Sequence, residues 1–405
     1  MNVLVLNCGS SSIKYQLLSM SGDGKEVLAK GIVERVGLPE GFLTHKPVGK
    51  DSFKLTRAFP AHVDGINAIL DALTDTQHGV LTDIHQIDAV GHRVAHGGEY
   101  FSGSVIIDGQ VKANIEKCSE LAPLHNPANL NGIVSMEKLL PDTPQVAVFD
   151  TSFHQTIPEK AYLYGVPYEY YQEYKIRRYG FHGTSHRFVA EKACKLADLD
   201  INNSKIVTCH MGNGVSVTAI KNGKSIDTSM GFTPLEGSVM GTRSGDIDAG
   251  IVTYLQEKKN LSPAEINNFL NKECGLSGIS GVSSDMRDLW TEYEQKGNQK
   301  AKLAIDIFIY RIAKYVGAYA VAMNGLDMVV YTGGIGENDW SVRLGISEYL
   351  GFMGAKIDKA VNCNLRTDRV ISVPESKIKI VLAETDEELV IATDTVNIIT
   401  KNSLK

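Results

Sequence analysis

The sequence predicts an α/β protein made of duplicated domains. Its 405 residues exceed what one ordinary hydrophobic core accommodates, so about two to three domains are expected. Short apolar strands alternate with amphipathic helices along the chain. The order strand, glycine-containing turn, strand occurs around Gly9 and again around Gly212, about half a chain further on. We therefore expect two related halves, each with a hairpin able to bind phosphate.

The composition is that of a globular protein and argues against several classes. Hydrophobic residues make up 43% of the chain and charged residues 22%, and the net charge is -6. A negative balance argues against a general nucleic-acid or membrane-surface binder, although local cations can still hold an anionic ligand. No apolar run approaches the ~20 residues of a membrane helix, and the N-terminus lacks the features of a signal peptide. The 6 cysteines form no CxxC pair, which favours buried thiols in a reducing, cytoplasmic location.

The first candidate for ligand binding is the turn NCGSSSIK at residues 7–14. It lies between an apolar strand at 3–6 and a second strand at 15–18. Its backbone N–H groups and hydroxyls suit a phosphate, and Lys14 adds a positive charge. A plain hairpin with Lys14 in solvent fits these residues equally well.

The next segments lead to an arginine. Residues 20–60 show no regular pattern, and residues 62–73 have the periodicity of an amphipathic helix. A buried strand at 87–90 then runs into GHRVAHGGE, where Arg93 follows the strand and Gly97 forces a turn. We expect this turn to present Arg93.

Two further candidates follow in the first half. His125 lies between two prolines in LAPLHNPANL, where Asn126 could cap a helix that begins at Pro127. Asp150 ends a buried strand at 146–149. Ligands of α/β sheets gather at the carboxyl ends of strands, which makes Asp150 a site candidate. Capping a turn is nevertheless the commoner role of such an aspartate.

Histidine and glycine mark the start of the second half. In RRYGFHGTSH, His182 precedes an amphipathic helix expected to run to about Leu196. A histidine at a glycine-flanked helix entry can be a tautomer-specific donor or a hydrogen-bonded core residue. A strand at 206–210, the turn MGNG and a strand at 215–220 form the second hairpin.

The loop at residues 229–248 is the most informative stretch of the chain. It contains four glycines and several apolar residues, and Arg243 is its only cation. We expect a packed loop that presents one guanidinium to a phosphate or a carboxylate. An ion pair of Arg243 with Asp246 or Asp248 fits equally well.

The C-terminal part adds helices and glycine-rich loops. A capping box at Ser262 and the pattern at 301–323 each predict a helix. A Gly/Ser loop at 277–289 and the stretch TGGIGEN at 332–338 are candidate nucleotide-binding loops. Glu387 lies in the first turn of a terminal helix, where the helix dipole alone would favour an acid.

Together these elements match the requirements of phosphoryl transfer. Glycine turns and Mg²⁺ can hold a polyphosphate, and separate cations can bind the transferring group. More than one cation on the acceptor side suggests an anionic acceptor. A carboxylate is already a nucleophile and needs no base, whereas an alcohol would call for one.

A series of motifs resembles the acetate kinase family, in the same order, from residue 3 to about 395. Such an ordered series over nearly the whole chain is highly specific. The motifs are NCGSSSIK, GHRVAHGGE, LAPLHNPANL, VAVFDTSFH, RRYGFHGTSH, HMGNG, DTSMGFTPLEG, MGTRSGDID, SGISGVSSDMRD, TGGIGEN and TDEEL.

The resemblance implies a fold and a reaction. The fold is the superfold of acetate and sugar kinases, Hsp70 and actin: two duplicated actin-like, ribonuclease H-like α/β domains with the active site in the cleft between them. The expected domains are residues 1–150, completed by a helix at about 388–405, and residues 151–387. The reaction is direct in-line transfer of the γ-phosphoryl group of ATP to acetate, giving acetyl phosphate and ADP. It uses Mg²⁺, for which Mn²⁺ could substitute, and the family forms homodimers.

The resemblance also assigns catalytic roles. Arg93 corresponds to the arginine that binds the carboxylate, and Asp150 corresponds to the active-site acid, which would orient Arg93 or a metal-bound water. His182 and Arg243 correspond to the groups that stabilise the transition state.

Ligand-binding roles follow in the same way. Asn7 and Glu387 correspond to the Mg²⁺ positions. The substrate positions correspond to Arg93, Ala95, Leu124, His125, Phe181 and Pro234. The ATP positions correspond to Lys14, His210, Met211, Gly212, Asn213, Gly214, Asp285, Met286, Arg287, Gly333, Gly334, Ile335, Gly336 and Glu337.

Two departures from the family pattern bear on specificity. The pocket position Ala95 is commonly valine in acetate-preferring members, so the added space could favour propionate, at ~1–3 kcal/mol per methylene. Before Glu387 this chain has Glu-Thr-Asp at 384–386 where the family usually has Pro-Thr-Asn, which alters the helix entry. A propionate kinase with the same mechanism is therefore the alternative. A non-enzymatic ATPase switch of the actin or Hsp70 type is disfavoured, because it would not need Arg93 and Arg243 in an acyl pocket.

Overall fold

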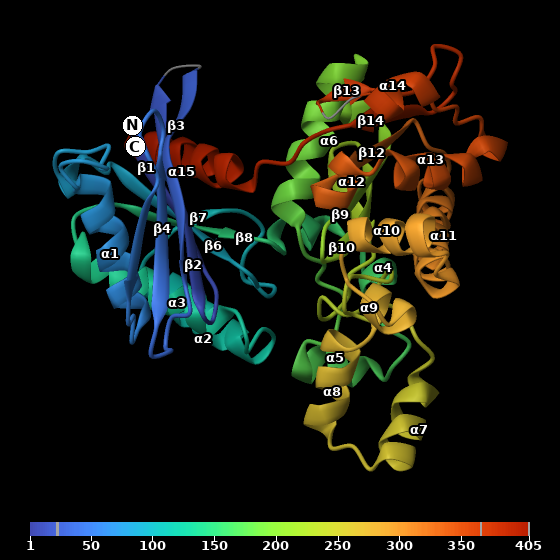
Figure 1. The fold of residues 1–405 in the computed structure, drawn as a ribbon, viewed down its shortest axis with the longest axis horizontal. Helices are drawn as coiled ribbons and strands as arrows, with labels where there is room; N and C mark the ends of the chain where they lie inside the picture. The colour runs from blue at the N-terminus through green and yellow to red at the C-terminus, as the bar shows by residue number, and fades with distance from the viewer. Residues whose placement is uncertain (22–23, 365–366, 404–405) are drawn as a thin grey trace. The chain divides into compact units, whose positions relative to one another are not determined.

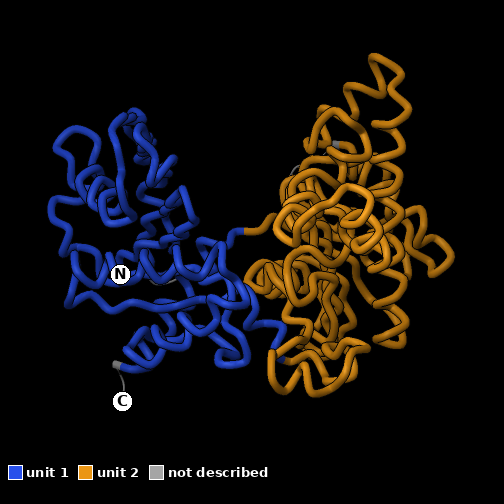
Figure 2. Tube along the Cα trace, turned by 90° about the horizontal axis from the view of Figure 1, so that it is seen from below, with its two compact units in different colours: residues 1–155, 386–405 blue, residues 156–385 orange. Residues whose placement is uncertain are grey.

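The computed structural model describes residues 1–21, 24–364 and 367–403. These residues form two compact units, shown in two colours in Figure 2. We call residues 1–155 with 386–405 the N-terminal unit and residues 156–385 the C-terminal unit. Across the described ranges, every helix is too short or too polar to cross a membrane.

An eight-stranded sheet forms the centre of the N-terminal unit, in the order β5-β4-β3-β2-β1-β6-β8-β7. β1 to β5 pair with antiparallel neighbours, whereas β1, β6 and β8 run parallel to one another. The carboxyl ends of these three strands therefore meet at one edge of the sheet. The strands are β1 (Asn2–Cys8), β2 (Ser12–Ser21), β3 (Gly24–Glu34), β4 (Gly41–Pro47), β5 (Phe53–Arg57), β6 (Ala89–Val94), β7 (Val105–Ile106) and β8 (Gln145–Phe149).

Helices cover both faces of this sheet (Figure 1). α1 (His62–Thr74) and α3 (Asn126–Leu139) share a hydrophobic core with Leu6 of β1. α15 (Glu387–Ser403) packs instead against Val5 of β1. Successive side chains of a strand point to opposite faces, so α15 lies on the face opposite α1 and α3. The unit also contains α2 (Gly109–Lys117).

A six-stranded sheet, β11-β10-β9-β12-β14-β13, forms the centre of the C-terminal unit. α11 (Gln299–Met323) packs on one face, where Phe308 meets Val207 and its neighbours in the core. α6 (Gly183–Ala197) packs against β9, β12 and β14. The strands are β9 (Lys205–Met211), β10 (Val215–Lys221), β11 (Lys224–Thr228), β12 (Met328–Thr332), β13 (Arg369–Val370) and β14 (Lys379–Leu382). The other helices are α4 (Glu159–Tyr162), α5 (Tyr168–Tyr174), α7 (Ala249–Lys259), α8 (Pro263–Lys272), α9 (Gly275–Ser280), α10 (Met286–Lys296), α12 (Gly333–Asn338), α13 (Trp340–Tyr349) and α14 (Lys359–Asn364).

The two sheets repeat one arrangement. The order β3-β2-β1-β6-β8 in one unit corresponds to β11-β10-β9-β12-β14 in the other. In both, the first three strands are antiparallel and the last three are parallel. The turns around Gly9 and Gly212 occupy the same place in this order. The predicted duplication is therefore confirmed by the strand topology.

The expectation of an irregular segment at residues 20–60 is wrong, because the described part of it forms β3, β4 and β5. The inward faces of these strands carry buried residues such as Val33 and Leu43. Their outward faces carry exposed lysines such as Lys30 and Lys46. Apolar residues of β3 and β4 occur only in runs of two or three, at 27–29, 32–33 and 42–43, and lysines and glycines interrupt these runs.

Three local expectations also change. Arg93 lies within β6 instead of following the strand. α3 begins at Asn126 with His125 at its N-cap. The Asn126 side chain accepts from the His96 N–H at 3.1 Å and donates to the His96 carbonyl at 2.9 Å, so it holds a distant turn instead of capping the helix. Residues 333–338 form the short helix α12 and not a loop.

Gly91 on β6 sets how closely α15 approaches the sheet. A Cβ atom at Gly91 would lie 2.6 Å from both Ile391 Cγ2 and Thr395 Oγ1. We expect Gly91→Ala to displace α15 and to lower the free energy of unfolding by about 1–3 kcal/mol, as measured by urea denaturation. Gly103→Ala is the matched control, because a Cβ there meets nothing within 4 Å. Equal stability of the two variants would contradict close packing of α15 at Gly91.

Candidate active site

Arg93 is the centre of a polar cluster in the N-terminal unit. Its Nε donates to Asp150 Oδ1 at 3.0 Å, and its Nη2 donates to Asp150 Oδ2 at 2.5 Å. Its Nη1 donates to Asn7 Oδ1 at 3.1 Å. Asn7 lies near the end of β1, Arg93 near the end of β6, and Asp150 directly after β8. The carboxyl ends of three adjacent parallel strands thus bring three predicted site residues together.

The Asp150 carboxylate determines the state of Arg93. Its negative charge raises the pKa of the Arg93 guanidinium above the ordinary value, so Arg93 stays cationic. The paired hydrogen bonds also fix the plane of the guanidinium. Both oxygens of Asp150 accept from Arg93, and Asp150 is 2% exposed. This geometry is that of a carboxylate that orients an arginine.

Glu387, in the first turn of α15, interacts electrostatically with this cluster. Burial raises the pKa of its carboxyl to about 7. The Arg93 charge opposes this rise, and the Asp150 and Glu388 carboxylates add to it. A cation beside Glu387 would favour the charged carboxylate.

The oxygen atoms of Asn7 and Glu387 fit the Mg²⁺ that the resemblance implies. Mg²⁺ prefers oxygen ligands and binds proteins through one or two carboxylates together with waters and substrate phosphates. Among the residues that the structure describes, no three His, Cys, Asp or Glu side chains form a metal site by themselves. The donors present therefore suit an ion shared with a phosphate ligand.

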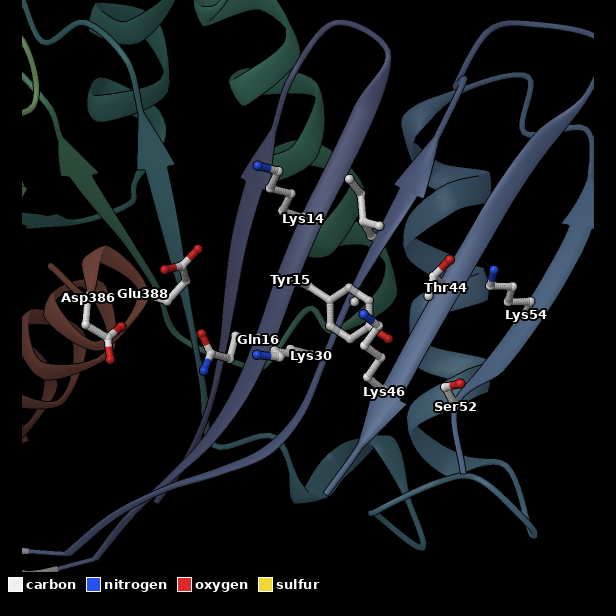
Figure 3. A pocket seen from close by; sticks show the side chains of 12 residues that line it. Lys14, Tyr15, Gln16, Lys30, Thr44, Lys46, Ser52, Lys54, Asp386 and Glu388 are labelled. Carbon is white, nitrogen blue, oxygen red and sulfur yellow. The ribbon is translucent and has the colours of Figure 1, made fainter. Parts of the chain in front are cut away.

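Lys14 lies on β2 directly opposite Asn7 on β1. It lines one end of an open hollow of about 880 Å³ on the outer face of β2 to β5 (Figure 3). Lys30, Lys46 and Lys54 line the same hollow. Asp386 and Glu388 line it as well, so the hollow beside the predicted ATP-binding residue Lys14 carries more lysines than carboxylates.

Three of the predicted substrate positions also lie in the N-terminal unit. Ala95 is buried, and its N–H donates to Asn129 Oδ1 at 3.0 Å. Asn129 Nδ2 donates to the Cys8 carbonyl at 2.7 Å, so Asn129 ties the turn after β6 to the end of β1. Leu124 is exposed, and His125 precedes α3. Asn129 is not among the predicted site residues. In the sequence, only its spacing of three residues from Asn126, on the same face of α3, points to it.

In the C-terminal unit, Arg243 lies in the irregular segment between β11 and α7, as predicted. Its Nη1 donates to the Pro234 carbonyl at 3.2 Å. Asp246 accepts instead from backbone and from Tyr315, and Asp248 caps α7. Among the described side chains, no carboxylate pairs with Arg243, which rules out the ion-pair alternative. Burial lowers the pKa of Arg243, and a half-buried guanidinium without an acid favours an anionic ligand.

His182 and Arg243 converge on the turn between β9 and β10. A Cβ atom at Gly214 would lie 3.5 Å from His182 Cε1 and 3.4 Å from Arg243 Nη1. His182 precedes α6 with a left-handed φ of 55, an unfavourable conformation for a histidine that often marks functional sites. Its ring stacks on His210 with centroids 4.2 Å apart. Two predicted transition-state groups thus approach one glycine turn.

The predicted nucleotide-binding residues of the C-terminal unit occupy three places. The first is the turn at residues 210–214. The second is the start of α10, where Asp285 pairs with Arg287 at 2.6 Å and this partner lowers the pKa of Asp285. The third is α12, where the Gly333 N–H donates to Glu337 Oε1 at 3.0 Å. A Cβ atom at Gly333 would lie 2.9 Å from the backbone of Met211 in the turn at residues 210–214, so α12 packs directly against this turn.

At Gly241, the Arg243 loop packs against two of these segments, the turn at residues 210–214 and the start of α10. A Cβ atom at Gly241 would lie 2.1 Å from Asn213 Oδ1 and 3.3 Å from Ser284 Cβ. The loop can approach the nucleotide positions this closely only without a side chain there. Phe181 and Met286 are buried in the hydrophobic core of the unit.

A family model described as the acetokinase family matches residues 2–393. This chain belongs to the acetokinase family. It is 52% identical over 401 residues to a protein of Desulfitobacterium hafniense named acetate kinase, with 99% of this chain and 100% of that protein covered. It is 55% identical to a protein of Carboxydothermus hydrogenoformans with the same name, with 98% and 99% covered.

Solved structures show the same fold. The structure of Porphyromonas gingivalis acetate kinase has a TM-score of 0.95 and 50% identity, with 98% of this chain and 99% of that chain covered. The structure of a propionate kinase from Francisella tularensis has a TM-score of 0.88 and 42% identity over the same shares. The predicted family and fold class are therefore confirmed.

In this member of the acetokinase family, Arg178 organises the start of the Arg243 loop. Its Nη1 donates to the Thr228 carbonyl at 2.7 Å, and its Nη2 donates to Glu236 Oε1 at 2.6 Å. The motif RRYGFHGTSH contains Arg177 and Arg178, and neither is among the predicted site residues. Their contacts are with residues about 50 positions further along the chain, which no local pattern reveals.

We expect Arg178→Met to lower the free energy of unfolding by about 2–4 kcal/mol, because Glu236 would keep its hydrogen bond from Tyr164 but lose its charged partner in a half-buried pair. Both tryptophans, Trp290 and Trp340, lie in the C-terminal unit, so urea denaturation followed by tryptophan fluorescence reports on this unit. Arg369→Met, at an exposed position of the same unit, is the control and should change the value by less than ~0.5 kcal/mol. Similar stability of both variants would show that the Arg178 contacts do not hold the loop.

Proposed function

We propose that this chain is an acetate kinase, which transfers the γ-phosphoryl group of ATP reversibly to acetate and forms acetyl phosphate and ADP. The observation that carries the proposal is Arg243, a half-buried guanidinium without a carboxylate partner among the described residues, beside His182 at a glycine turn. Membership of the acetokinase family and the likeness to proteins named acetate kinase over nearly the whole chain support the same reaction.

The acceptor carboxylate requires a cation and no base. Asp150 and Asn7 hold the Arg93 guanidinium through Nε and both Nη atoms, and each Nη atom keeps one further N–H for a ligand. The two oxygens of acetate match such a fork of donors. One acetate oxygen then forms the bond to the γ-phosphorus while the bond from that phosphorus to the β–γ bridging oxygen breaks. No proton is transferred.

His182 and Arg243 would donate hydrogen bonds to the equatorial oxygens of the transferring group. Donors held in place before the reaction stabilise charge that develops in the transition state. Mg²⁺, for which Asn7 and Glu387 fit, would neutralise charge on the polyphosphate.

We also propose that the N-terminal and C-terminal units are the two actin-like domains, and that two copies of the chain form a homodimer. Exposed apolar side chains of the C-terminal unit support an interface: Val321 on α11 is 81% exposed and Phe352 after α13 is 86% exposed. Tyr310 and Tyr349 join them, with rings 5.8 Å apart. The cysteines of the described chain are free thiols, which fits the proposed reducing, cytoplasmic location.

A propionate kinase with the same mechanism is the second candidate. The buried Ala95 favours it, because this position of the predicted acyl pocket carries a small side chain. The likeness to a structure named propionate kinase also shows that this fold is used by an enzyme of that name.

We expect Arg243→Ala to lower kcat by about 10²- to 10³-fold with smaller changes in the KM for ATP and acetate, because the lost donor acts in the transition state. The measurement is acyl phosphate formation from Mg-ATP and acetate, with the product trapped by hydroxylamine. Arg369→Ala is the control, since Arg369 is exposed on β13 and is not one of the predicted site residues. A kcat within about threefold of the unaltered protein would remove Arg243 from the mechanism.

The acyl preference is tested by kcat/KM for acetate, propionate and butyrate with the unaltered protein and with Ala95→Val. If Ala95 sets the pocket, the added methyl groups should shift the ratio of acetate to propionate toward acetate by about 10-fold or more. An unchanged ratio would show that Ala95 does not line the acyl pocket. Absence of acyl phosphate from all three acids would refute the proposed function.

A further inference from the structure

The C-terminal sheet buries polar side chains on the face that α6 covers. Thr208 on β9 and Ser216 and Thr218 on β10 have no exposed area, and His210 is 8% exposed. The opposite face of the same strands carries apolar residues such as Val207, which pack against α11. A buried hydroxyl or imidazole costs free energy unless it is hydrogen-bonded. The hydroxyl and imidazole groups of this polar layer are therefore expected to be hydrogen-bonded.

Four of the groups around this layer form one chain of hydrogen bonds. Thr208 Oγ1 lies 2.7 Å from His186 Nδ1, and His186 Nε2 lies 2.6 Å from Ser216 Oγ. Ser216 Oγ lies 2.9 Å from His182 Nδ1. His182 Nε2, the last ring nitrogen of the chain, lies 3.7 Å from the Cβ position of Gly214. This chain of hydrogen bonds thus leads from the sheet to the glycine turn that Arg243 also approaches.

The hydroxyl of Ser216 couples the protons of the two rings. It has one hydrogen and two imidazole partners, so it can donate to only one of the two rings. If it donates to His182 Nδ1, a neutral His182 carries its hydrogen on Nε2. His186 must then donate from Nε2 to Ser216 and accept at Nδ1 from Thr208. If every hydrogen is reversed, a neutral His182 turns a lone pair toward Gly214.

An anionic phosphoryl group at this turn distinguishes the two arrangements. It is stabilised by a hydrogen on His182 Nε2 and repelled by a lone pair there. Arg243 Nη1, at 3.4 Å from the same Cβ position, supplies donors on the neighbouring side. The His210 ring stacks on His182 and bonds through Nδ1 to Ser185 Oγ at 2.9 Å. Ser216 bonds directly to a ring nitrogen of His182, so its hydroxyl can determine which ring nitrogen carries the hydrogen.

We propose that Ser216, supported by His186 and Thr208, fixes His182 as the tautomer with its hydrogen on Nε2, so that a neutral His182 donates to the transferring phosphoryl group. Ser216, His186 and Thr208 are positioning residues in this scheme, because they act through His182. The catalytic consequence rests on the proposed acetate kinase reaction. The tautomer itself is a property of the free protein.

The first experiment measures the tautomers directly in the full-length protein. Protein labelled with ¹⁵N in the histidine rings gives distinct ring-nitrogen shifts for each tautomer, and the His182 signals are assigned by their loss in His182→Gln. We expect a hydrogen on Nε2 of both His182 and His186 and none on either Nδ1. A hydrogen on Nδ1 of neutral His182 in the unaltered protein would overturn the proposal. This readout does not depend on enzymatic activity.

The second experiment tests whether this chain of hydrogen bonds affects kcat. We expect Ser216→Ala to lower kcat for acetyl phosphate formation by about 10- to 100-fold with nearly unchanged KM values, as for other residues that orient a functional histidine. Thr208→Val should lower kcat in the same direction and change the His186 spectrum. Thr218→Val is the control, because Thr218 is equally buried on β10 but bonds to Thr228 at 2.8 Å and to no histidine.

The outcomes separate this proposal from the proposed function. Full kcat in both Ser216→Ala and Thr208→Val would overturn the positioning role. An equal loss in Thr218→Val would do the same, since it would reflect general damage to the buried layer. An unaltered protein that forms no acetyl phosphate would refute the proposed function while the His182 tautomer is still measured. If Ser216→Ala does not fold, the unaltered spectrum and Thr208→Val still decide the question.

Discussion

A guanidinium group that leaves water must recover its hydration from hydrogen bonds or from an opposite charge, and three arginines of this protein do so in different ways. Arg93 is held by Asp150 and Asn7, and Arg178 is held by Glu236 and backbone carbonyls. Arg243 has only a carbonyl partner and a thioether contact among the described residues. The first two arginines have their charge balanced within the protein. The third retains an unbalanced positive charge, which an anionic ligand can balance.

The duplicated topology explains why such different groups occupy similar places. In the N-terminal unit, the ends of β1, β6 and β8 carry Asn7, Arg93 and Asp150. In the C-terminal unit, the parallel strand β9 ends at Met211, before the glycine turn, and β12 ends at Thr332, before α12. Ligands of α/β sheets bind at such edges because backbone groups and helix starts are exposed there. One arrangement thus supplies the Arg93 cluster in one half and the glycine turn beside His182 and Arg243 in the other.

The sequence predicts those parts of the site whose chemistry is local. The glycine turns, Asp150 at a strand end and Arg243 as the only cation of its loop are all visible in short stretches. Contacts between distant segments are not visible, and Asn126, Asn129 and Arg178 were missed because each binds backbone at least 30 residues away. The strands β3 to β5 were missed because lysines and glycines interrupt their short apolar runs, so β3 and β4 lack the strict alternation that marks a half-buried strand.

The two faces of the C-terminal sheet differ in composition, and we expect them to differ in their effects on stability and on catalysis. The face under α11 is apolar, and its contacts are those of an ordinary core. The face under α6 buries hydroxyls and imidazoles, whose net contribution to stability is small even when they are paired. The roles of Thr208 and Ser216 are better explained by orientation, since their hydrogen bonds hold the rings of His186 and His182 near the Gly214 turn. Substitutions under α11 should therefore act mainly on unfolding, whereas substitutions of Thr208 and Ser216 should act mainly on kcat.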